Sequence, residues 1–453
     1  MLYDFITADK GLKTPMYRQI YLSIRTTIES GSLKKDTKLP SIRKLCDALG
    51  VSKTTVTSAY DQLCVEGYVY NKPQSGYFVA AQFNAPPLHE NESKKSEQNN
   101  AYAYYDFSGK SIDEKIVNLT EWKKNIKDVI NSNYLLTSYG DTQGEKTLRD
   151  ALQKYALGIR SVNSSANNII IGAGTQPLLY LLCSLLGQNK KVSMDVNSFV
   201  QSEFVFKSFG YEIEYFKSDK DGASVSSLEE IKPDIIMINP NFSGTDGSNM
   251  PVTRRLEIIE WAKNNNALIV EDDYNGELRY STHPVPCVQN YDAQNTVYIG
   301  SFSKVLLPSV RISYIVMPDK LMDEYRKISR LTNQTASKIE QLALARYINA
   351  GKIDVHLRKA RRVYFEKSRA IIESVEKHFD GCKTVFNETS LYLTIKTGFQ
   401  INADKLKAEL EANSVSVMPL QPGSSEVSLS FSGIPIERID KGIELLHNII
   451  SHT

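Results

Sequence analysis

A lysine with a particular set of neighbours stands in the second half of the chain. Lys304 lies in SFSKVLLPSVR, with Ser301 three positions before it and Arg311 seven positions after it. The strand expected before this segment ends in VEDDY, which supplies Asp272 and Tyr274. Pyridoxal phosphate requires an amine for a Schiff base, a carboxylate for its ring nitrogen, a donor to its ring hydroxyl, and cations or hydroxyls for its phosphate. We predict that these five residues supply that set, with Lys304 as the Schiff-base residue.

A glycine-rich turn upstream could contact the phosphate of the same cofactor. The segment IIIGAGTQPLLYLL is typical of a strand, a turn and a helix, so the backbone N–H groups of Gly174, Thr175 and Gln176 would point at an anion. The alternative is an ordinary connection between a strand and a helix. Phe199, in SMDVNSFVQ, is placed to stack on the pyridine ring, and the alternative for it is a core aromatic residue.

The elements that must position these residues alternate between strand-like and helical patterns. The strand-like runs share a high content of Val and Ile: IIIGAG, KVSMDV, DIIMINP, ALIVEDD and TVYIGS. Such alternation is typical of an α/β domain.

Residues 106–450 resemble the fold-type I aminotransferases. The matching segments are YGDTQGEKTLRDAL, GAGTQPLL, MDVNSF, EDDYNGELRY and SFSKVLLPSVR. The resemblance implies a large α/β lobe around a mixed or parallel sheet and a smaller C-terminal α+β lobe. It implies a homodimer, because the tyrosine matched by Tyr139 is generally supplied by the partner subunit. It also adds Ser303 to the residues around the phosphate.

Two positions depart from this resemblance. Related proteins read roughly LRLGF near the C-terminus, and that arginine clamps the α-carboxylate of a substrate or effector, whereas VSLSF places Ser428 there. A hydroxyl cannot make the bidentate charged contact of a guanidinium. The loop that reads NPTG in aminotransferases, with its asparagine on the ring hydroxyl, reads NPNFSGTDG here. Either Asn239 or Asn241 could substitute for that asparagine.

The first 80 residues predict three short helices and a two-stranded wing. The apolar residues of the first helix recur at three- and four-residue spacing: Tyr17, Ile20, Tyr21, Ile24 and Ile28. Ser41 should cap the second helix, Gly50 should end it, and Ser52 should cap the third. The residues expected to face inward on these two helices are Ile42, Leu45, Leu49, Val56, Ala59, Tyr60 and Leu63. GYVYNKPQSGYFVA then supplies two strands around a turn.

This segment resembles the GntR winged-helix family, whose pattern of YRQI, LPSxRxL, VSxxTVxxAYxxLxxEGY and a GxF-type wing matches almost all of residues 15–80. A helix whose first turn displays Lys and Thr suits a reader of the DNA major groove. The DNA contacts that the resemblance implies are Arg43, Lys53, Thr54, Thr55, Thr57 and Gly76. Thr57 stands where many members have Arg, so one phosphate or base contact is lost. The alternative is a helical bundle for protein interaction.

Composition and charge agree with two soluble parts joined by a linker. The chain has 453 residues, 41% hydrophobic and 23% charged, and no apolar run approaches the roughly 20 residues that span a bilayer. The first 80 residues hold 11 Lys/Arg against 7 Asp/Glu, so positive charge is concentrated there. Residues 81–105 are poor in aliphatic side chains. We therefore predict a DNA-binding domain over 1–80, a linker over 81–105 and a cofactor-binding domain over 106–453.

The N-terminus lacks the apolar segment of a signal peptide, so we expect a cytoplasmic protein without membrane contact. The five cysteines are odd in number and lack CxxC or Cys/His spacing. We expect them to be reduced core residues, and we expect no metal site.

Together the two halves resemble the MocR subfamily of GntR regulators. The resemblance implies a homodimeric transcription regulator that binds pyridoxal phosphate and an operator with repeated half-sites. Because the carboxylate clamp is missing, we hypothesise that pyridoxal phosphate itself is the effector and that vitamin B6 synthesis or salvage is controlled, as in PdxR-type members. The alternatives are an amino-acid-responsive regulator, such as the GABA-responsive members, and an aminotransferase with an accessory DNA-binding domain. We expect a sensor rather than an enzyme.

Overall fold

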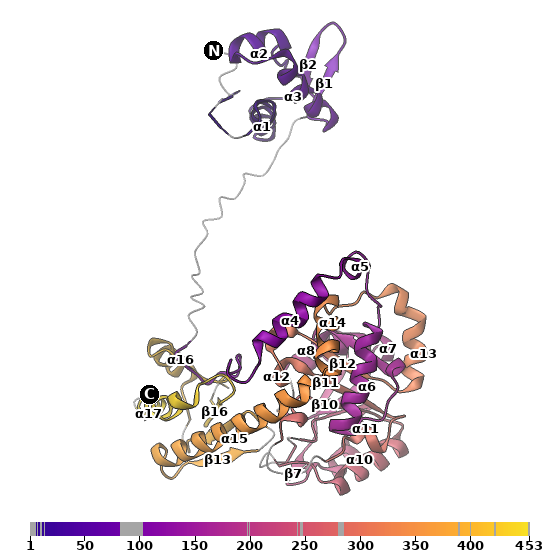
Figure 1. The fold of residues 1–453 in the computed structure, drawn as a ribbon, viewed down its shortest axis with the longest axis vertical. Helices are drawn as coiled ribbons and strands as arrows, with labels where there is room; N and C mark the ends of the chain where they lie inside the picture. The colour runs from indigo at the N-terminus through magenta and orange to yellow at the C-terminus, as the bar shows by residue number, and fades with distance from the viewer. Residues whose placement is uncertain are drawn as a thin grey trace. The chain divides into compact units, whose positions relative to one another are not determined.

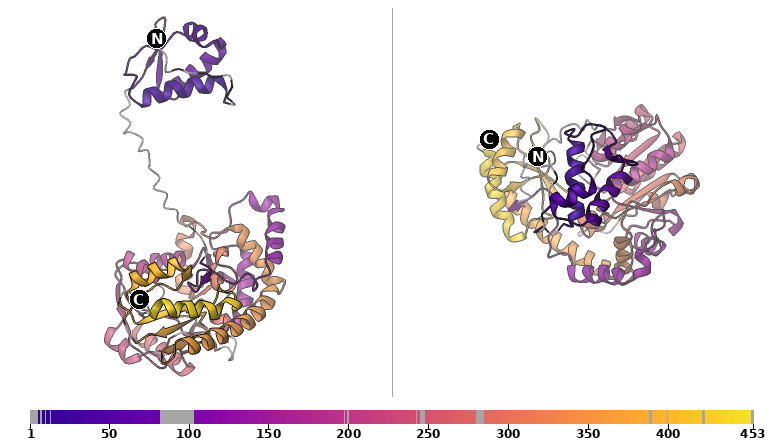
Figure 2. Two further views of the ribbon diagram at one scale, coloured as in Figure 1. Left: turned by 90° about the vertical axis from the view of Figure 1, so that its left-hand side faces the viewer. Right: turned by 90° about the horizontal axis from the view of Figure 1, so that it is seen from above.

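The computed structural model divides the chain into two compact units, Met1–Asn100 and Ala101–Thr453. It describes residues 6, 8, 9, 11, 12, 14–81 and 103–451, except 197, 199, 242, 245–247, 280–284, 388–389, 399 and 421–422. Most of the predicted linker, and Phe199, therefore lie outside the described residues. Figure 1 and Figure 2 show the elements of each unit. None of the helices in the described part of the chain combines the length and apolar character needed to cross a membrane.

The first unit is a winged helix-turn-helix, as the sequence predicts. Its elements in chain order are α1 (Met16–Glu29), α2 (Ile42–Leu49), α3 (Lys53–Val65), β1 (Val69–Lys72) and β2 (Gly76–Val79). Ser41 caps α2 by accepting from Lys44 N at 3.3 Å, and Ser52 caps α3 by accepting from Thr55 N at 3.2 Å. Gly50 ends α2 in the left-handed conformation. β1 and β2 pair as an antiparallel hairpin, the wing.

The core of this unit confirms most of the predicted inward positions. The fully buried side chains of the three helices are Ile20, Tyr21, Ile24, Ile28, Leu45, Val56, Ala59, Tyr60 and Leu63. Tyr17 was expected in the buried stripe and is instead exposed, because it lies one turn before Ile20, in the first turn of α1. Ile42 and Leu49 are only partly buried, since they lie at the two ends of the short helix α2.

The second unit is built around a seven-stranded mixed sheet. The strand order across the sheet is β4 (Ile169–Gly172), β12 (Ser313–Val316), β11 (Thr296–Ser301), β10 (Leu268–Asp273), β9 (Ile235–Ile238), β5 (Lys191–Met194) and β6 (Glu212–Tyr215). β12 is antiparallel to both of its neighbours, β4 and β11, and the other strand pairs of the sheet are parallel. The five runs predicted as strands form β4, β5, β9, β10 and β11, so the predicted α/β class is confirmed.

Helices cover both faces of this sheet, and for that reason strands such as β9, β11 and β12 are buried throughout their length. One face packs against α7 (Thr175–Leu186), α8 (Val200–Ser208) and α13 (Asp319–Ile328). The other packs against α6 (Lys146–Arg160), α9 (Val225–Ile231), α10 (Val252–Asn265) and α14 (Lys338–Asn349), and α4 (Leu119–Ile130) lies on α14. The short segments between them are α5 (Asn133–Leu136), β7 (Ser218–Asp219), β8 (Gly222–Ala223), α11 (Val288–Tyr291) and α12 (Phe302–Val305).

A smaller lobe follows the long helix α15 (Lys352–His378), which runs toward it in Figure 1. The lobe holds an antiparallel sheet of β13 (Lys383–Phe386), β14 (Tyr392–Lys396) and β16 (Glu426–Ser430), with α16 (Ala403–Ala412) and α17 (Ile439–Ser451). The start of this second unit is also part of the smaller lobe, because β3 (Tyr105–Asp106) pairs with β15 (Val415–Ser416).

Candidate functional site

Lys304 lies on the short helix α12, and this helix begins directly after the last residue of β11. Its Nζ donates to the carbonyl oxygen of Gly109 at 2.5 Å. Burial lowers the pKa of the Lys304 amine, and the carboxylate of Asp106 acts in the opposite direction. A lowered pKa increases the neutral fraction of the amine, which is the form that condenses with an aldehyde.

Asp272 occupies the end of β10, next to β11, with only 6% of its surface exposed. Its Oδ1 has no hydrogen-bond partner among the described residues. Burial raises the pKa of the Asp272 carboxyl to about 7, and the charge of Asp273 adds to the shift. Tyr274 follows two residues later, and burial also raises the pKa of its phenol. A buried carboxylate without a partner is costly, so this position suits a ligand that brings a cationic N–H group.

The opposite end of the site has the features of an anion cradle. Gly174 precedes the first turn of α7 with φ of 106°, and a Cβ on it would lie 2.7 Å from Arg311 Nη2. Arg311 itself has φ of 49°, an unusual backbone conformation for a residue with a side chain. Its guanidinium lies within 3.5 Å of Ser303 Oγ. A helix N-terminus facing a guanidinium and hydroxyl groups favours a phosphate.

These residues line one cavity of about 430 Å³. The predicted residues on its wall are Gly174, Thr175, Gln176, Asn239, Asp272, Tyr274, Ser301, Ser303, Lys304 and Arg311. The volume lies within the range of ordinary cofactor sites, roughly 300–1,000 Å³. The chemistry of the wall fits pyridoxal phosphate, with an amine, a buried carboxylate for the ring nitrogen and an anion cradle.

The two asparagines of the NPNF segment lie in different surroundings. Asn239 lines the cavity, whereas Asn241 is fully buried. Asn241 Nδ2 donates to Asp273 Oδ1 at 2.7 Å, and Arg160 Nε donates to the other oxygen of Asp273 at 2.6 Å. Asn241 is therefore held by the Asp273–Arg160 ion pair and is not among the described residues of the cavity wall, so Asn239 is the asparagine available to a ligand.

The residues predicted to contact DNA lie on α2, α3 and the wing. Arg43, Lys53 and Thr54 are exposed. Thr55 and Thr57 are half-buried, and the hydroxyls of Thr54 and Thr55 lie 2.8 Å from the capping Ser52 Oγ. Gly76 begins β2 with φ of 107°, and a Cβ on it would lie 3.5 Å from Lys38. Lys38 was not predicted as a site residue, because only the pairing of its strand segment with Phe78 brings it to the wing.

Comparison with known proteins assigns both units. Residues 16–79 match the gntR family of bacterial regulatory proteins, and residues 106–443 match the class I and II aminotransferases. The HTH-type transcriptional regulator YhdI of Bacillus subtilis is 33% identical over 97% of this chain and 96% of its own. The chain belongs to the gntR family and carries an aminotransferase domain. The probable rhizopine catabolism regulatory protein MocR of Rhizobium meliloti is 28% identical over 98% of this chain and 95% of its own, so the regulator is of the MocR type.

Two further proteins are similar to the regulator over most of its length. The pyridoxine biosynthesis regulator PdxR of Corynebacterium glutamicum is 25% identical over 80% of this chain and 78% of its own. An archaeal alanine:glyoxylate aminotransferase superposes with a TM-score of 0.72 at 22% identity, covering 79% of this chain and 93% of its own. The second likeness establishes the aminotransferase fold of the domain.

One predicted ligand-contacting residue, Tyr139, does not lie on the cavity wall within the described single chain. Tyr139 is fully exposed, at 104% of its reference surface, and is not among the residues of the cavity wall. Phe199 lies outside the described residues. The exposure of Tyr139 agrees with the expectation that this tyrosine contacts the cofactor of the partner subunit. The single chain does not test that expectation.

Ser428, at the position of the missing carboxylate clamp, lies on β16 beside β14. Its Oγ is 2.8 Å from Thr394 Oγ1, and the two residues are direct cross-strand partners. Among the described residues, the cations on the cavity wall are Lys304 and Arg311. In the predicted arrangement Lys304 binds the cofactor aldehyde and Arg311 binds its phosphate. The described cavity wall of the regulator therefore has no further cation that could bind a carboxylate.

Other residues of the cavity wall had not been predicted. They are Asp195, Ser198, Gln201, Phe216, Met237, Ile238, Ser243 and Tyr392. Tyr392 is the least expected of these, since it comes from β14 of the smaller lobe. Asp195 follows β5 directly, and its place at a strand end was the one feature of the sequence that could have indicated it.

Proposed function

We propose that this regulator binds pyridoxal phosphate in the 430 Å³ cavity, attached to Lys304. The observation that carries the proposal is the buried Asp272 carboxylate, which has no partner among the described residues and lies in the same cavity as the amine and the anion cradle. When bound, the cofactor supplies an aldehyde and a ring that withdraws electrons.

We propose the following roles for the residues of this site. Asp272 accepts a hydrogen bond from the ring N–H, and Tyr274 and Asn239 contact the ring hydroxyl. Phe199 stacks on the ring. The phosphate is held by the backbone of Gly174, Thr175 and Gln176 and by the side chains of Ser301, Ser303 and Arg311, with Tyr139 coming from the partner subunit of a homodimer.

The effector that we propose is pyridoxal phosphate itself, and the controlled genes are those of vitamin B6 synthesis or salvage. Support comes from Ser428, which has replaced the arginine that would hold an amino-acid carboxylate, and from a described cavity wall whose cations are Lys304 and Arg311. The name of the relative PdxR, a pyridoxine biosynthesis regulator, agrees with this assignment.

The test follows operator binding of the full chain while cofactor is added to protein that has been stripped of it. Fluorescence anisotropy of a labelled fragment of the gene's own promoter should change as the cofactor saturates Lys304. A change produced by an amino acid such as GABA, with none produced by the cofactor alone, would instead establish the amino-acid-responsive alternative.

The enzyme alternative is favoured by one observation, the presence on the cavity wall of the amine, the ring carboxylate and the phosphate contacts. Without a guanidinium, however, a substrate carboxylate would be poorly oriented. Half-reaction assays with several amino acids test this alternative, because conversion of the cofactor to its amine form is visible in the absorbance spectrum.

For the DNA, we propose that α3 enters the major groove and that the wing contacts the backbone. The contacts are Arg43, Lys53, Thr54, Thr55, Thr57 and Gly76. Residues 81–105 serve as the linker between a DNA-binding domain over 1–80 and a dimeric domain over 106–453. A dimer with two such heads should bind repeated half-sites, and its affinity should fall steeply with salt.

A further inference from the structure

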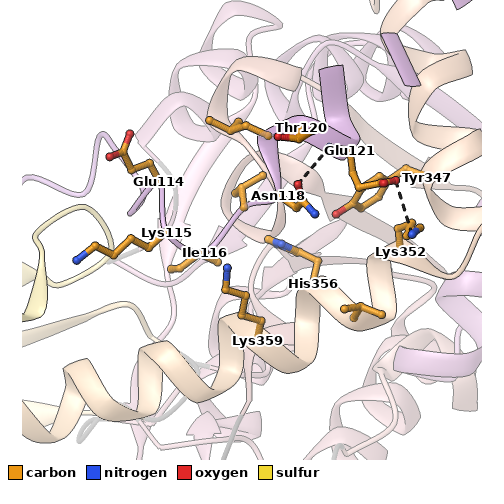
Figure 3. A pocket seen from close by; sticks show the side chains of 13 residues that line it. Glu114, Lys115, Ile116, Asn118, Thr120, Glu121, Tyr347, Lys352, His356 and Lys359 are labelled. Atoms are coloured by element: carbon orange, nitrogen blue, oxygen red, sulfur yellow. Dashed lines mark hydrogen bonds and ion pairs between the residues drawn. The ribbon is translucent and has the colours of Figure 1, made fainter. Parts of the chain in front are cut away.

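A cavity of about 650 Å³ lies between the N-terminus of α4 and the first turns of α15 (Figure 3). The buried histidine on its wall, His356, has its Nε2 2.6 Å from the carbonyl oxygen of Val305, and its ring also contacts the backbone of Ile116. Lys352, on the same wall, lies 3.7 Å from Glu121. These contacts join α15 to the segments packed against it, so the cavity calls for no ligand of its own.

The wing of the first unit belongs to a small sheet of three segments. Besides β1, the strand β2 pairs with the segment around Lys38, where Lys38 lies opposite Phe78. The residues that alternate with this pair are buried: Leu39, Val69 and Val79. Since successive side chains of a strand point to opposite faces, Lys38 and Phe78 lie on the outer face of the sheet.

A row of three side chains crosses this outer face. Tyr70 and Phe78 are cross-strand partners, and their rings stack with centroids 5.6 Å apart and an angle of 25° between the ring planes. On the other side of Phe78, Lys38 Nζ lies 5.8 Å from the ring centroid, within reach of a cation–π interaction. The Tyr70 hydroxyl donates to Asp36 at 2.9 Å. The ring of Phe78 is therefore fixed from one side and restricts the Lys38 ammonium on the other.

The Lys38 side chain extends toward the tip of the wing. A Cβ on Gly76, the first residue of β2, would lie 3.5 Å from Lys38 Cε, so the lysine stem passes over this glycine. Lys72 is the cross-strand partner of Gly76 in β1, and it leaves from the outer face as Tyr70 does. Two lysines thus flank a residue without a side chain, at the position where the family resemblance implies a DNA contact.

The charges of Lys38 and Lys72 are not neutralised within the unit. Both side chains are exposed, and the one ion pair among the described residues of the unit joins Arg25 and Glu29. The carboxylate of Asp36, two residues before Lys38, accepts from the Tyr70 hydroxyl instead. An ammonium is a point charge that suits the oxygens of a phosphate.

We propose that Lys38, held beside Gly76 by the ring of Phe78, binds a phosphate of the operator backbone, and that Lys72 adds positive charge on the other side of the glycine. This proposal rests on the proposed binding of DNA by α3 and the wing. It adds to that binding face a residue that precedes α2 in the chain and reaches the wing only through its pairing with β2.

The test measures the operator affinity of the full chain by fluorescence anisotropy at several salt concentrations. Lys38→Gln should weaken binding about tenfold and reduce the slope of log affinity against log salt by about 0.9, the share of one phosphate contact. The loss should be the same on an unrelated duplex of equal length, because a phosphate contact carries no sequence information. Lys35→Gln is the matched control, because Lys35 is exposed and lies beyond Asp36, at the end of the segment away from the wing tip.

Phe78→Leu tests the role of the ring while keeping every charge. It should weaken binding in the native chain but have no further effect in Lys38→Gln, because it acts through Lys38. A loss of equal size in both backgrounds would show that Phe78 supports only the fold of the wing, and would overturn its role in holding Lys38.

Equal affinities of Lys38→Gln and Lys35→Gln would overturn the proposal. So would a loss confined to the operator, which would assign Lys38 to a base edge. Lys53→Ala, on α3, separates the proposal from the function on which it rests. If Lys53→Ala weakens operator binding and Lys38→Gln does not, only the contact of Lys38 is wrong; if neither weakens it, the proposed DNA-binding face is wrong as well.

Discussion

Replacing Asp272 with Asn should stabilise the regulator when the cofactor is absent. In the folded chain, burial raises the pKa of the Asp272 carboxyl from 3.8 to about 7. Between these two pH values the folded protein keeps a proton that the unfolded chain releases, so stability falls as pH rises through this window. Above pH 7 the cost is fully present, and a shift of about three pKa units corresponds to roughly 4 kcal/mol. Asparagine cannot ionise and avoids this cost.

The measurement is urea unfolding of protein stripped of cofactor, at pH 8 and at pH 4.5. Trp122 and Trp261 are the two tryptophans, and both lie in the second unit, so tryptophan fluorescence reports the unfolding of that unit alone. Asp272→Asn should exceed the native protein in free energy of unfolding by up to roughly 4 kcal/mol at pH 8, and the difference should shrink to about 1 kcal/mol at pH 4.5, because the carboxyl of the unfolded chain is still mostly ionised there. Asp323→Asn, at an exposed carboxylate on α13, is the control and should change little at either pH.

Cofactor should reverse the order of stability at pH 8. In the native protein the ring N–H would give Asp272 the partner it lacks, whereas asparagine would leave the ring nitrogen without a carboxylate. Pyridoxal phosphate should therefore stabilise the native protein more than Asp272→Asn. If the stripped variant is less stable than the native protein at pH 8, or if the difference does not shrink in acid, the carboxylate is not an unpaired buried charge.

The remaining predictions concern the cofactor lysine, the DNA contact and the clamp position. Lys304→Ala should abolish the visible absorbance of protein mixed with pyridoxal phosphate while leaving the circular dichroism spectrum unchanged, and an unchanged absorbance would assign the attachment to another residue. Lys53→Ala should weaken operator binding in anisotropy titrations and reduce the slope of log affinity against log salt by about one, the share of a single phosphate contact. Ser428→Arg should introduce the carboxylate clamp, so an amino acid should then perturb the cofactor spectrum; no response to any amino acid would show that Thr394 and its surroundings exclude that side chain.

The sequence predicted those parts of the fold and of the site that depend on local pattern. The strands are short runs rich in Val and Ile, and Asp272 near the end of β10 and Lys304 shortly after β11 belong to two strands that prove to be neighbours. The capping of α2 by Ser41 and of α3 by Ser52 could be predicted because each cap depends only on the residues of the following turn. Tyr392 could not be predicted, because its place on the cavity wall depends on how the smaller lobe packs.

The choice between Asn239 and Asn241 also needed three-dimensional information. The two residues are two positions apart in one segment, and each has the same amide group. What separates them is Asp273, which accepts a hydrogen bond from the side-chain amide of Asn241. Since Asp273 lies next to Asp272 with its side chain on the opposite face of β10, the strand that supplies the ring carboxylate also fixes which asparagine remains available.

Residues 105–109, near the start of the second unit, contact both the smaller lobe and the amine of Lys304. Tyr105 and Asp106 pair with β15, Phe107 exchanges backbone hydrogen bonds with Ser416 and Ser430, and Gly109 accepts from Lys304. A lysine amine attached to the aldehyde of the cofactor would have fewer N–H groups left to donate than the free ammonium. If pyridoxal phosphate binds to Lys304 as proposed, the hydrogen bond to Gly109 at one end of residues 105–109 would therefore be lost. Occupancy of the pocket would in this way change the hydrogen bonding of the residues that follow the predicted linker, without any need for a contact between the two units.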